Sequence, residues 1–206
     1  MVLRRVLVVW LLLLLWGTQI HAEAALSSES DVDVKIKSMQ LRPCAQGQSF
    51  DCVKVEVVMS IDAPVETVWQ VITDYQHAAE FISNLRSSKE TPLAANSVMV
   101  EQIGRVGWGV VSVDIKTVYK VSLSPLEKRI QSVAVGGDLR AVTMLTQLKS
   151  NGKGGSLLEY SLITDPGPWA PLSIAEELLK RQARQSFEDL RREIMKRHGS
   201  AGNVKP

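Results

Sequence analysis

The end of the chain constrains the fold most, because one long amphipathic helix follows a series of strands. Residues 172–197 carry apolar side chains on one helical face, and charges of both signs occupy the other. The apolar face consists of Ala175, Leu178, Leu179, Ala183, Phe187, Leu190 and Ile194. A sheet with one apolar face needs a covering element, and a single long helix can cover a sheet that curls around it. The sequence therefore predicts an α+β fold with a curved antiparallel sheet wrapped around the C-terminal helix.

The sheet is predicted to have about seven strands. The clearest is 110–123, where Val111, Val113 and Ile115 alternate with polar residues, as in a strand with one buried face. The predicted strands are 32–37, 53–61, 97–106, 110–123, 129–135, 139–148 and 156–163. Short glycine-containing turns separate the last three of them. The first two form a hairpin, and the other five form a meander.

Two short helices are predicted between the hairpin and the meander. Asp62 can cap a helix whose first turn contains Pro64, and residues 65–72 then place apolar side chains on one stripe. A break at Asp74 and Tyr75 precedes a second helix within 76–84, and a turn is expected at Thr91 and Pro92.

The N-terminus has the three parts of a secretory signal peptide. Two arginines precede an uninterrupted apolar run, 6–16, and a small and polar segment follows it. The run is shorter than the roughly 20 residues of a membrane-spanning helix. The small residues Ala22 and Ala24 predict cleavage before Ala25. Residues 1–24 are thus expected to direct export to a periplasm or to the medium, and an uncleaved anchor is the alternative.

Export decides how the two cysteines are interpreted. Cys44 and Cys52 flank a polar loop between two predicted strands, and an oxidising compartment lets them pair. A metal pair or a redox pair is the alternative, but the spacing differs from C-x-x-C and no histidine lies nearby. We expect a structural disulfide and no metal site.

Composition excludes one class of partner. The 206 residues carry 24 basic and 22 acidic side chains, which gives a formal net charge of +2. This balance offers no broad attraction to nucleic acid, so no nucleic-acid partner is expected.

The segment 61–82 resembles the opening of the START-like, helix-grip (SRPBCC) superfamily. That superfamily includes polyketide cyclases/dehydrases and coenzyme Q-binding proteins. The matching residues are Asp62, Ala63, Pro64, Val68, Trp69, Asp74, Tyr75, Phe81 and Ile82. The Gly137-Asp138 turn and the prolines before the last helix are also similar to the family. The resemblance implies one helix-grip domain over 32–197, followed by a disordered tail, 198–206.

The resemblance also implies a hydrophobic cavity that holds a lipid, an isoprenoid or a quinone. Residues predicted to line it are Trp69, Tyr75, Phe81, Arg105, Trp108, Tyr119, Arg140, Trp169, Leu179 and Phe187. An inward-facing arginine would need an acid or a polar ligand head group as its partner, whereas an outward-facing one would be solvated. The hydroxyl of Tyr119 could orient a ligand oxygen.

Catalytic signals are sparse. After cleavage only His77 and His198 remain as histidines, and no nucleophile, phosphate-binding or zinc-protease motif occurs in the required context. We therefore expect no catalytic residue and no cofactor. An exported carrier of a hydrophobic ligand is favoured over an interaction module with a filled core and over an enzyme of the cyclase or aromatase type. A transient membrane contact and the oligomeric state are left open.

Overall fold

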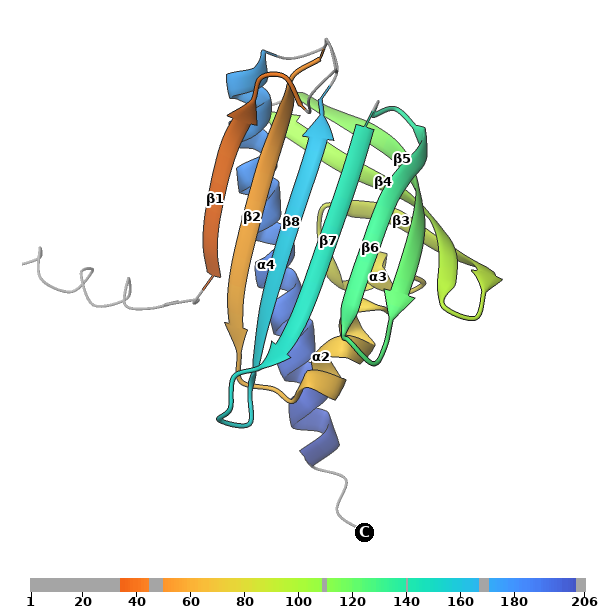
Figure 1. The fold of residues 1–206 in the computed structure, drawn as a ribbon, viewed down its shortest axis with the longest axis vertical. Helices are drawn as coiled ribbons and strands as arrows, with labels where there is room; N and C mark the ends of the chain where they lie inside the picture. The colour runs from red at the N-terminus through yellow and green to blue at the C-terminus, as the bar shows by residue number, and fades with distance from the viewer. Residues whose placement is uncertain (1–33, 45–49, 109–110, 140, 167–170, 203–206) are drawn as a thin grey trace, which may run out of the picture. The chain divides into compact units, whose positions relative to one another are not determined.

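The computed structural model describes residues 34–44, 50–108, 111–139, 141–166 and 171–202. In this part of the chain, eight antiparallel strands form one curved sheet, and the helix α4 runs along its inner side (Figure 1). The strands are β1 (Val34–Leu41), β2 (Cys52–Ile61), β3 (Leu85–Ala94), β4 (Ser97–Trp108), β5 (Val111–Ser124), β6 (Arg129–Gly137), β7 (Ala141–Ser150) and β8 (Ser156–Asp165). The helices are α2 (Val65–Ile72), α3 (Ala78–Phe81) and α4 (Leu172–Gly202). The predicted helix-grip architecture is confirmed.

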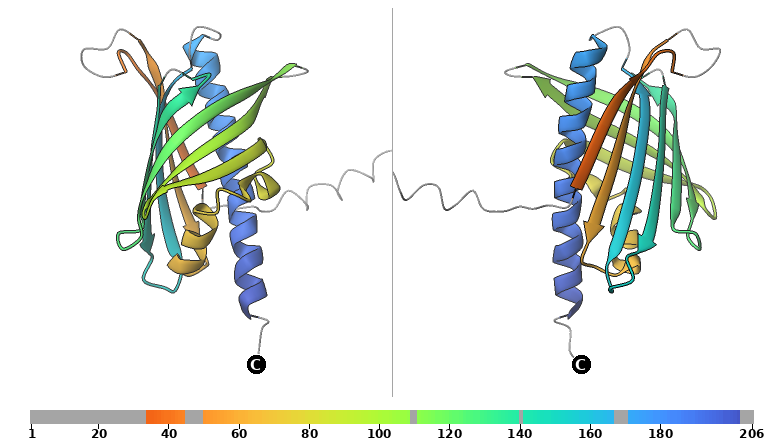
Figure 2. Two further views of the ribbon diagram at one scale, coloured as in Figure 1. Left: turned by 90° about the vertical axis from the view of Figure 1, so that its right-hand side faces the viewer. Right: turned by 60° about the vertical axis from the view of Figure 1, so that its left-hand side comes forward.

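The strand order is β1-β2-β8-β7-β6-β5-β4-β3, so the first hairpin pairs with the last strand. The helices α2 and α3 make the crossover from β2 to the far edge at β3. Figure 2 shows how the sheet bends around α4, whose C-terminal turns extend past the strand ends beside α2.

Alternation in β2 shows why the sheet binds the helix. Every second side chain is fully buried, namely Val53, Val55, Val57, Met59 and Ile61, and each residue between them is more exposed to solvent. Period-two placement puts the buried set on the face toward α4. Strands β1 and β2 consequently pack directly against the helix.

The strand β3 was not predicted. Its sequence is mostly polar and includes Pro92, which lacks an N–H group and is tolerated at a sheet edge. The expected turn at Thr91 and Pro92 is therefore wrong, because both residues pair with β4. An edge strand with little buried surface gives no alternating apolar pattern.

The helix α4 is longer than predicted. It begins at Leu172 as expected but continues to Gly202, five residues beyond Arg197. Ser200 Oγ donates to the Lys196 carbonyl within this extension. The rest of the predicted tail, 203–206, lies outside the described residues.

The cysteine prediction is confirmed. Cys44 and Cys52 form a disulfide with a Cα–Cα distance of 4.8 Å. The bond joins the loop after β1 to the first residue of β2 and closes the hairpin.

The sheet splits between β6 and β7. Their pairing ends at Val133 and Thr143; beyond it Gly136 pairs with Val118 of β5, and Val142 pairs with Thr164 of β8. Gly137 follows with φ +106°, where a side chain would collide with the backbone of β5. Asp138 fixes the turn, because its carboxylate accepts from the Lys116 N–H at 2.7 Å. The split separates the two halves of the sheet at one end.

Candidate functional site

A cavity of about 350 Å³ lies between the inner face of the sheet and α4. This volume is within the range of small-molecule sites in proteins. The sheet contributes every second residue of four strands: Gln102, Gly104 and Val106 of β4, Ile115, Thr117 and Tyr119 of β5, Val142 and Met144 of β7, and Tyr160, Leu162 and Thr164 of β8. The cavity thus follows from strand alternation.

The helix supplies the opposite wall. Its lining residues recur at helical spacing: Ala175, Leu178, Leu179, Gln182, Ala183, Ser186, Phe187 and Leu190. The first residue of β3, Leu85, and the segments that flank the strands, with Ile82, Asn84, Leu139 and Pro166, complete the lining. None of the lining residues in the described part of the chain is charged. The site can therefore hold an apolar molecule but offers it no ion pair from these residues.

A packed cluster closes one end of the cavity. Val98, Val100, Val121 and Ile130 are buried there, and Trp69, Ile72, Tyr75, Tyr119 and Leu123 pack against them. Tyr119 belongs both to this cluster and to the cavity wall. The ammonium of Lys128 lies 5.1 Å from the centre of the Trp69 ring. Large aromatic side chains thus fill the half of the sheet near α2, and the cavity occupies the other half.

Three tyrosines meet at this closed end. Burial raises the pKa of Tyr160 far above its usual value, and the nearby Tyr119 and Tyr75 raise it further. Burial likewise raises the pKa of Tyr119, although a hydrogen bond with Thr117 acts against the shift. The Tyr160 ring packs edge-on against Phe187, with 5.1 Å between centroids. These hydroxyls consequently stay neutral and able to donate at physiological pH.

Thr164 has a hydroxyl in an unusual environment. The residue lines the cavity and is 1% exposed, and its Oγ1 meets no hydrogen-bond partner among the described residues. Its strand neighbours Val53 and Val142 are buried and apolar. An unsatisfied buried hydroxyl costs stability.

Polar side chains join α4 to the β3–β4 side of the sheet. Gln182 Nε2 donates to the Arg105 carbonyl at 3.0 Å, and Asn84 Nδ2 donates to Ser186 Oγ at 2.9 Å. Further along the helix, Asp189 accepts hydrogen bonds from the Ser83 N–H and hydroxyl. Burial acts to raise the pKa of Asp189, but the hydrogen bonds from Ser83 and Gln185 and the charge of Arg192 together hold the pKa below its usual value. We call these contacts, made by residues 83, 84, 105, 182, 186 and 189, the polar seam.

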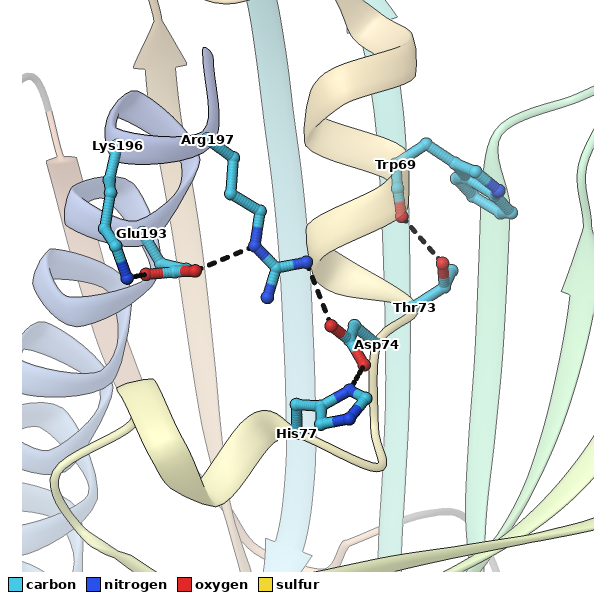
Figure 3. Close-up of polar contacts among 7 residues, drawn as sticks. All are labelled: Trp69, Thr73, Asp74, His77, Glu193, Lys196 and Arg197. Atoms are coloured by element: carbon cyan, nitrogen blue, oxygen red, sulfur yellow. Dashed lines mark hydrogen bonds and ion pairs between the residues drawn. The ribbon is translucent and has the colours of Figure 1, made fainter. Parts of the chain in front are cut away.

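A second network ties the loop after α2 to the end of α4 (Figure 3). Arg197 donates to Asp74 at 2.9 Å and to Glu193 at 2.8 Å, and His77 Nδ1 lies 2.6 Å from the Asp74 carboxylate. Burial acts to raise the pKa of Asp74, but the hydrogen bonds from His77 and Arg197 lower it overall. The hydrogen bond between His77 and Asp74 also raises the pKa of His77. His77 is exposed and is not among the cavity-lining residues, and its contact is with Asp74, the carboxylate that Arg197 of α4 also binds.

The structure brings only some of the predicted site residues to the cavity. Tyr119, Leu179 and Phe187 line it. Trp69 and Tyr75 lie in the packed cluster behind Tyr119. Phe81 is not a lining residue, and its ring lies 5.5 Å from the Arg197 guanidinium.

Arg105 faces away from the cavity. Its neighbours Gly104 and Val106 point inward, and its own Nε donates to Asp114 at 3.0 Å on the exposed side. The structure does not describe the side chain of Trp108, nor Arg140 and Trp169, so the predictions for these three lie outside the described part.

Sequence reasoning missed Tyr160, Thr164 and Gln182. Tyr160 and Thr164 alternate with Leu158 and Leu162 at every second position of β8, so all four side chains point to the same, inner face of the sheet. Thr164 lies one residue beyond the predicted strand 156–163. Gln182 lies between Leu179 and Ala183 on the apolar stripe of the helix. Each position could thus have been found by extending the periodic pattern to polar residues.

The described residues contain no group of three or more histidine, cysteine, aspartate or glutamate side chains that could hold a metal ion. No helix in the same residues has the length and apolar character needed to cross a bilayer.

Comparison with known proteins gives a consistent picture of the fold. The STAR-related lipid transfer protein from Xanthomonas axonopodis superposes with a TM-score of 0.60 at 13% identity, covering 82% of this chain and 97% of the other. Human STARD10 gives 0.61 at 16% identity, over 82% and 72%. The Zhui aromatase/cyclase from Streptomyces sp. R1128 gives 0.63 at 11% identity, over 82% and 100%. A comparison with curated proteins found no match.

The sequence itself matches a family over most of the described domain. The match spans residues 53–194, from the first buried valine of β2 to the last buried isoleucine of α4, and the family is described as polyketide cyclase / dehydrase and lipid transport. This range is more than half of the chain and includes all the cavity-lining residues. The resemblance noted from the sequence is therefore confirmed, and the chain belongs to the polyketide cyclase/dehydrase and lipid transport family.

Proposed function

We propose that this protein is an exported carrier that binds a hydrophobic molecule, a lipid, isoprenoid or quinone, between the sheet and α4. The observation that carries the proposal is the cavity of about 350 Å³ with uncharged and mostly apolar lining. A filled-core interaction module would leave no such space. The lipid transfer in the name of one structural neighbour, the Xanthomonas axonopodis protein, agrees with this function.

Export is supported by two independent features. The pattern of 1–24 is typical of a cleaved signal peptide. The disulfide between Cys44 and Cys52 suits an oxidising compartment. N-terminal sequencing of the exported protein should give Ala25 as the first residue, and retention of the apolar run would contradict this part of the proposal.

The binding function can be tested by mass spectrometry of a solvent extract from protein purified after native export. We expect an apolar molecule in stoichiometric amount. Ala183→Phe places a large side chain into the cavity from α4 and should abolish retention. Arg181→Phe introduces the same side chain on the exposed side of that helix and should leave retention unchanged.

The comparison of the two variants separates a cavity ligand from a surface contaminant. A molecule retained equally by Ala183→Phe, or a clean extract from the unaltered protein, would contradict the carrier function. Thermal unfolding of both variants checks that each is folded.

A further inference from the structure

Tyr160 and Thr164 of β8 both carry hydroxyls and line the cavity, but the two residues differ in how accessible they are to a bound molecule. Oγ1 of Thr164 has less than 1 Å² of accessible surface, so a bound molecule cannot contact it without side-chain rotation. Tyr160 lies deep in the domain but is not fully buried, and it is a lining residue. Of these two residues of β8, Tyr160 is therefore the one that a ligand can contact.

The hydroxyl of Tyr160 forms no hydrogen bond with any residue in the described part of the chain. Its ring packs against Phe187. Apart from Thr164, whose Oγ1 is out of a ligand's reach, other polar side chains of the wall already have partners. Asn84 and Ser186 bond each other, Gln182 bonds a backbone carbonyl, and the Gln102 amide donates to Ser88.

From these contacts, and resting on the proposed function, we infer that the cavity selects an uncharged ligand with a hydroxyl or carbonyl oxygen that hydrogen-bonds Tyr160 at the closed end. The apolar part of the ligand then extends along β7, β8 and α4, where Met144, Leu162 and Leu179 form the wall.

The same geometry disfavours both less polar ligands and charged ligands. A pure hydrocarbon would bury the Tyr160 hydroxyl without a partner, which is unfavourable. A carboxylate would enter an apolar site where the described lining contains no cation, and burial of an unpaired charge is more costly still. Because burial keeps the Tyr160 hydroxyl neutral, the preference should hold across neutral pH.

The test uses three ligands with one carbon skeleton: farnesene, farnesol and farnesoic acid. Their affinities for delipidated full-length mature protein are measured at pH 8 by displacement of the neutral fluorophore 1-N-phenylnaphthylamine. We expect farnesol to bind about tenfold more tightly than farnesene, the effect of one hydrogen bond that is otherwise lost. Ionised farnesoic acid should bind at least about tenfold more weakly than farnesol.

Variants assign the preference to one hydroxyl. Tyr160→Phe should abolish the preference for farnesol, because the farnesol hydroxyl then has no partner, and should leave farnesene affinity equal or higher, because the hydrocarbon no longer buries an unpaired hydroxyl. Retained binding of farnesene also shows that the variant is folded. Tyr75→Phe removes a neighbouring buried hydroxyl that does not line the cavity, and it should keep the tenfold preference.

The outcomes separate the two proposals. Binding of farnesene with no preference for farnesol overturns this inference and leaves the carrier function standing. Preferential binding of farnesoic acid overturns it too and indicates a cation in the site. Failure of all three ligands and the fluorophore to bind overturns the carrier function and the inference with it.

Discussion

Thr164→Val should make the ligand-free protein more stable, although it alters a buried residue at the cavity. The substitution exchanges Oγ1 for a methyl group and keeps the branched shape that suits a strand. In the structure this oxygen has no hydrogen-bond partner among the described residues, and the residue is 1% exposed. Val53 and Val142, its partners on either side, are 0% and 3% exposed. The new methyl group therefore enters an apolar layer.

The size of the effect follows from the cost of an unsatisfied buried hydroxyl. That cost is about 1–3 kcal/mol, so the free energy of unfolding should rise by about this amount. For a domain of this size, about 1 kcal/mol shifts Tm by roughly 2–4 °C. The expected increase in Tm is thus about 2–12 °C.

The assay is thermal unfolding of delipidated protein, followed by circular dichroism. Thr143→Val is the matched control, since Thr143 lies on β7 next to Val142 but points to the exposed face. A surface change of this kind should alter stability by less than about 0.5 kcal/mol. An unchanged or lower Tm for Thr164→Val, with the control behaving as stated, would refute the assignment of an unpaired hydroxyl.

Two further predictions concern the contacts that hold α4. Asp189→Ala removes the buried carboxylate of the polar seam and should lower the free energy of unfolding by about 1.5–3 kcal/mol, the range for hydrogen bonds to a charged group. Glu177→Ala, on an exposed turn of the same helix, is the control and should leave the free energy of unfolding unchanged. Urea unfolding of both variants measures the difference. His77 has a raised pKa in the folded protein, so its stabilising contribution is complete below about pH 6.5 and is lost as the pH rises through the folded pKa. The Tm difference between the unaltered protein and His77→Asn should consequently be present at pH 5.5 and vanish by pH 9, and a difference that is constant over this range would contradict the pairing.

The fold was largely predictable because most strands bury one face. Burial of one face imposes the period of two, which is visible in β2 and β5 without any structure. The exception is β3, whose polar residues lie at the open edge and receive little packing. Its pairing with β4 depends on backbone hydrogen bonds, which any sequence without excess proline can make.

The site was predictable only in part, for a different physical reason. Periodicity identifies which side chains of the strands and of α4 face each other, and by this criterion Leu179 and Phe187 of α4 point toward the sheet, where both line the cavity. It does not say where inward side chains meet and where they leave a space. Trp69 and Tyr75 face inward as well, but they are large enough to reach their neighbours and fill the domain near α2.

Arg105 illustrates a signal that was present and not used. Gln102, Gly104 and Val106 occupy one phase of β4, and Arg105 occupies the other with Glu101 and Ile103. Its outward position and its ion pair with Asp114 follow from that phase alone. Whether an arginine in a strand points inward or outward is thus better predicted from its position in the alternating pattern than from the possible partners of its guanidinium group.

The two edges of the sheet hold α4 by different means, and the difference bears on how a ligand could enter. On the β1–β2 side the helix packs on fully buried valines, a contact that resists opening because it would expose apolar surface. On the β3–β4 side the polar seam holds the helix, and its neutral hydrogen bonds, made by Asn84 and Gln182, are ones that water can replace at small net cost. Three residues of this seam also line the cavity, namely Asn84, Gln182 and Ser186. Separation of α4 from the β3–β4 side would therefore expose the cavity to solvent. Ligand exchange is therefore expected on the β3–β4 side, with the packing against β1 and β2 acting as the fixed side of the motion.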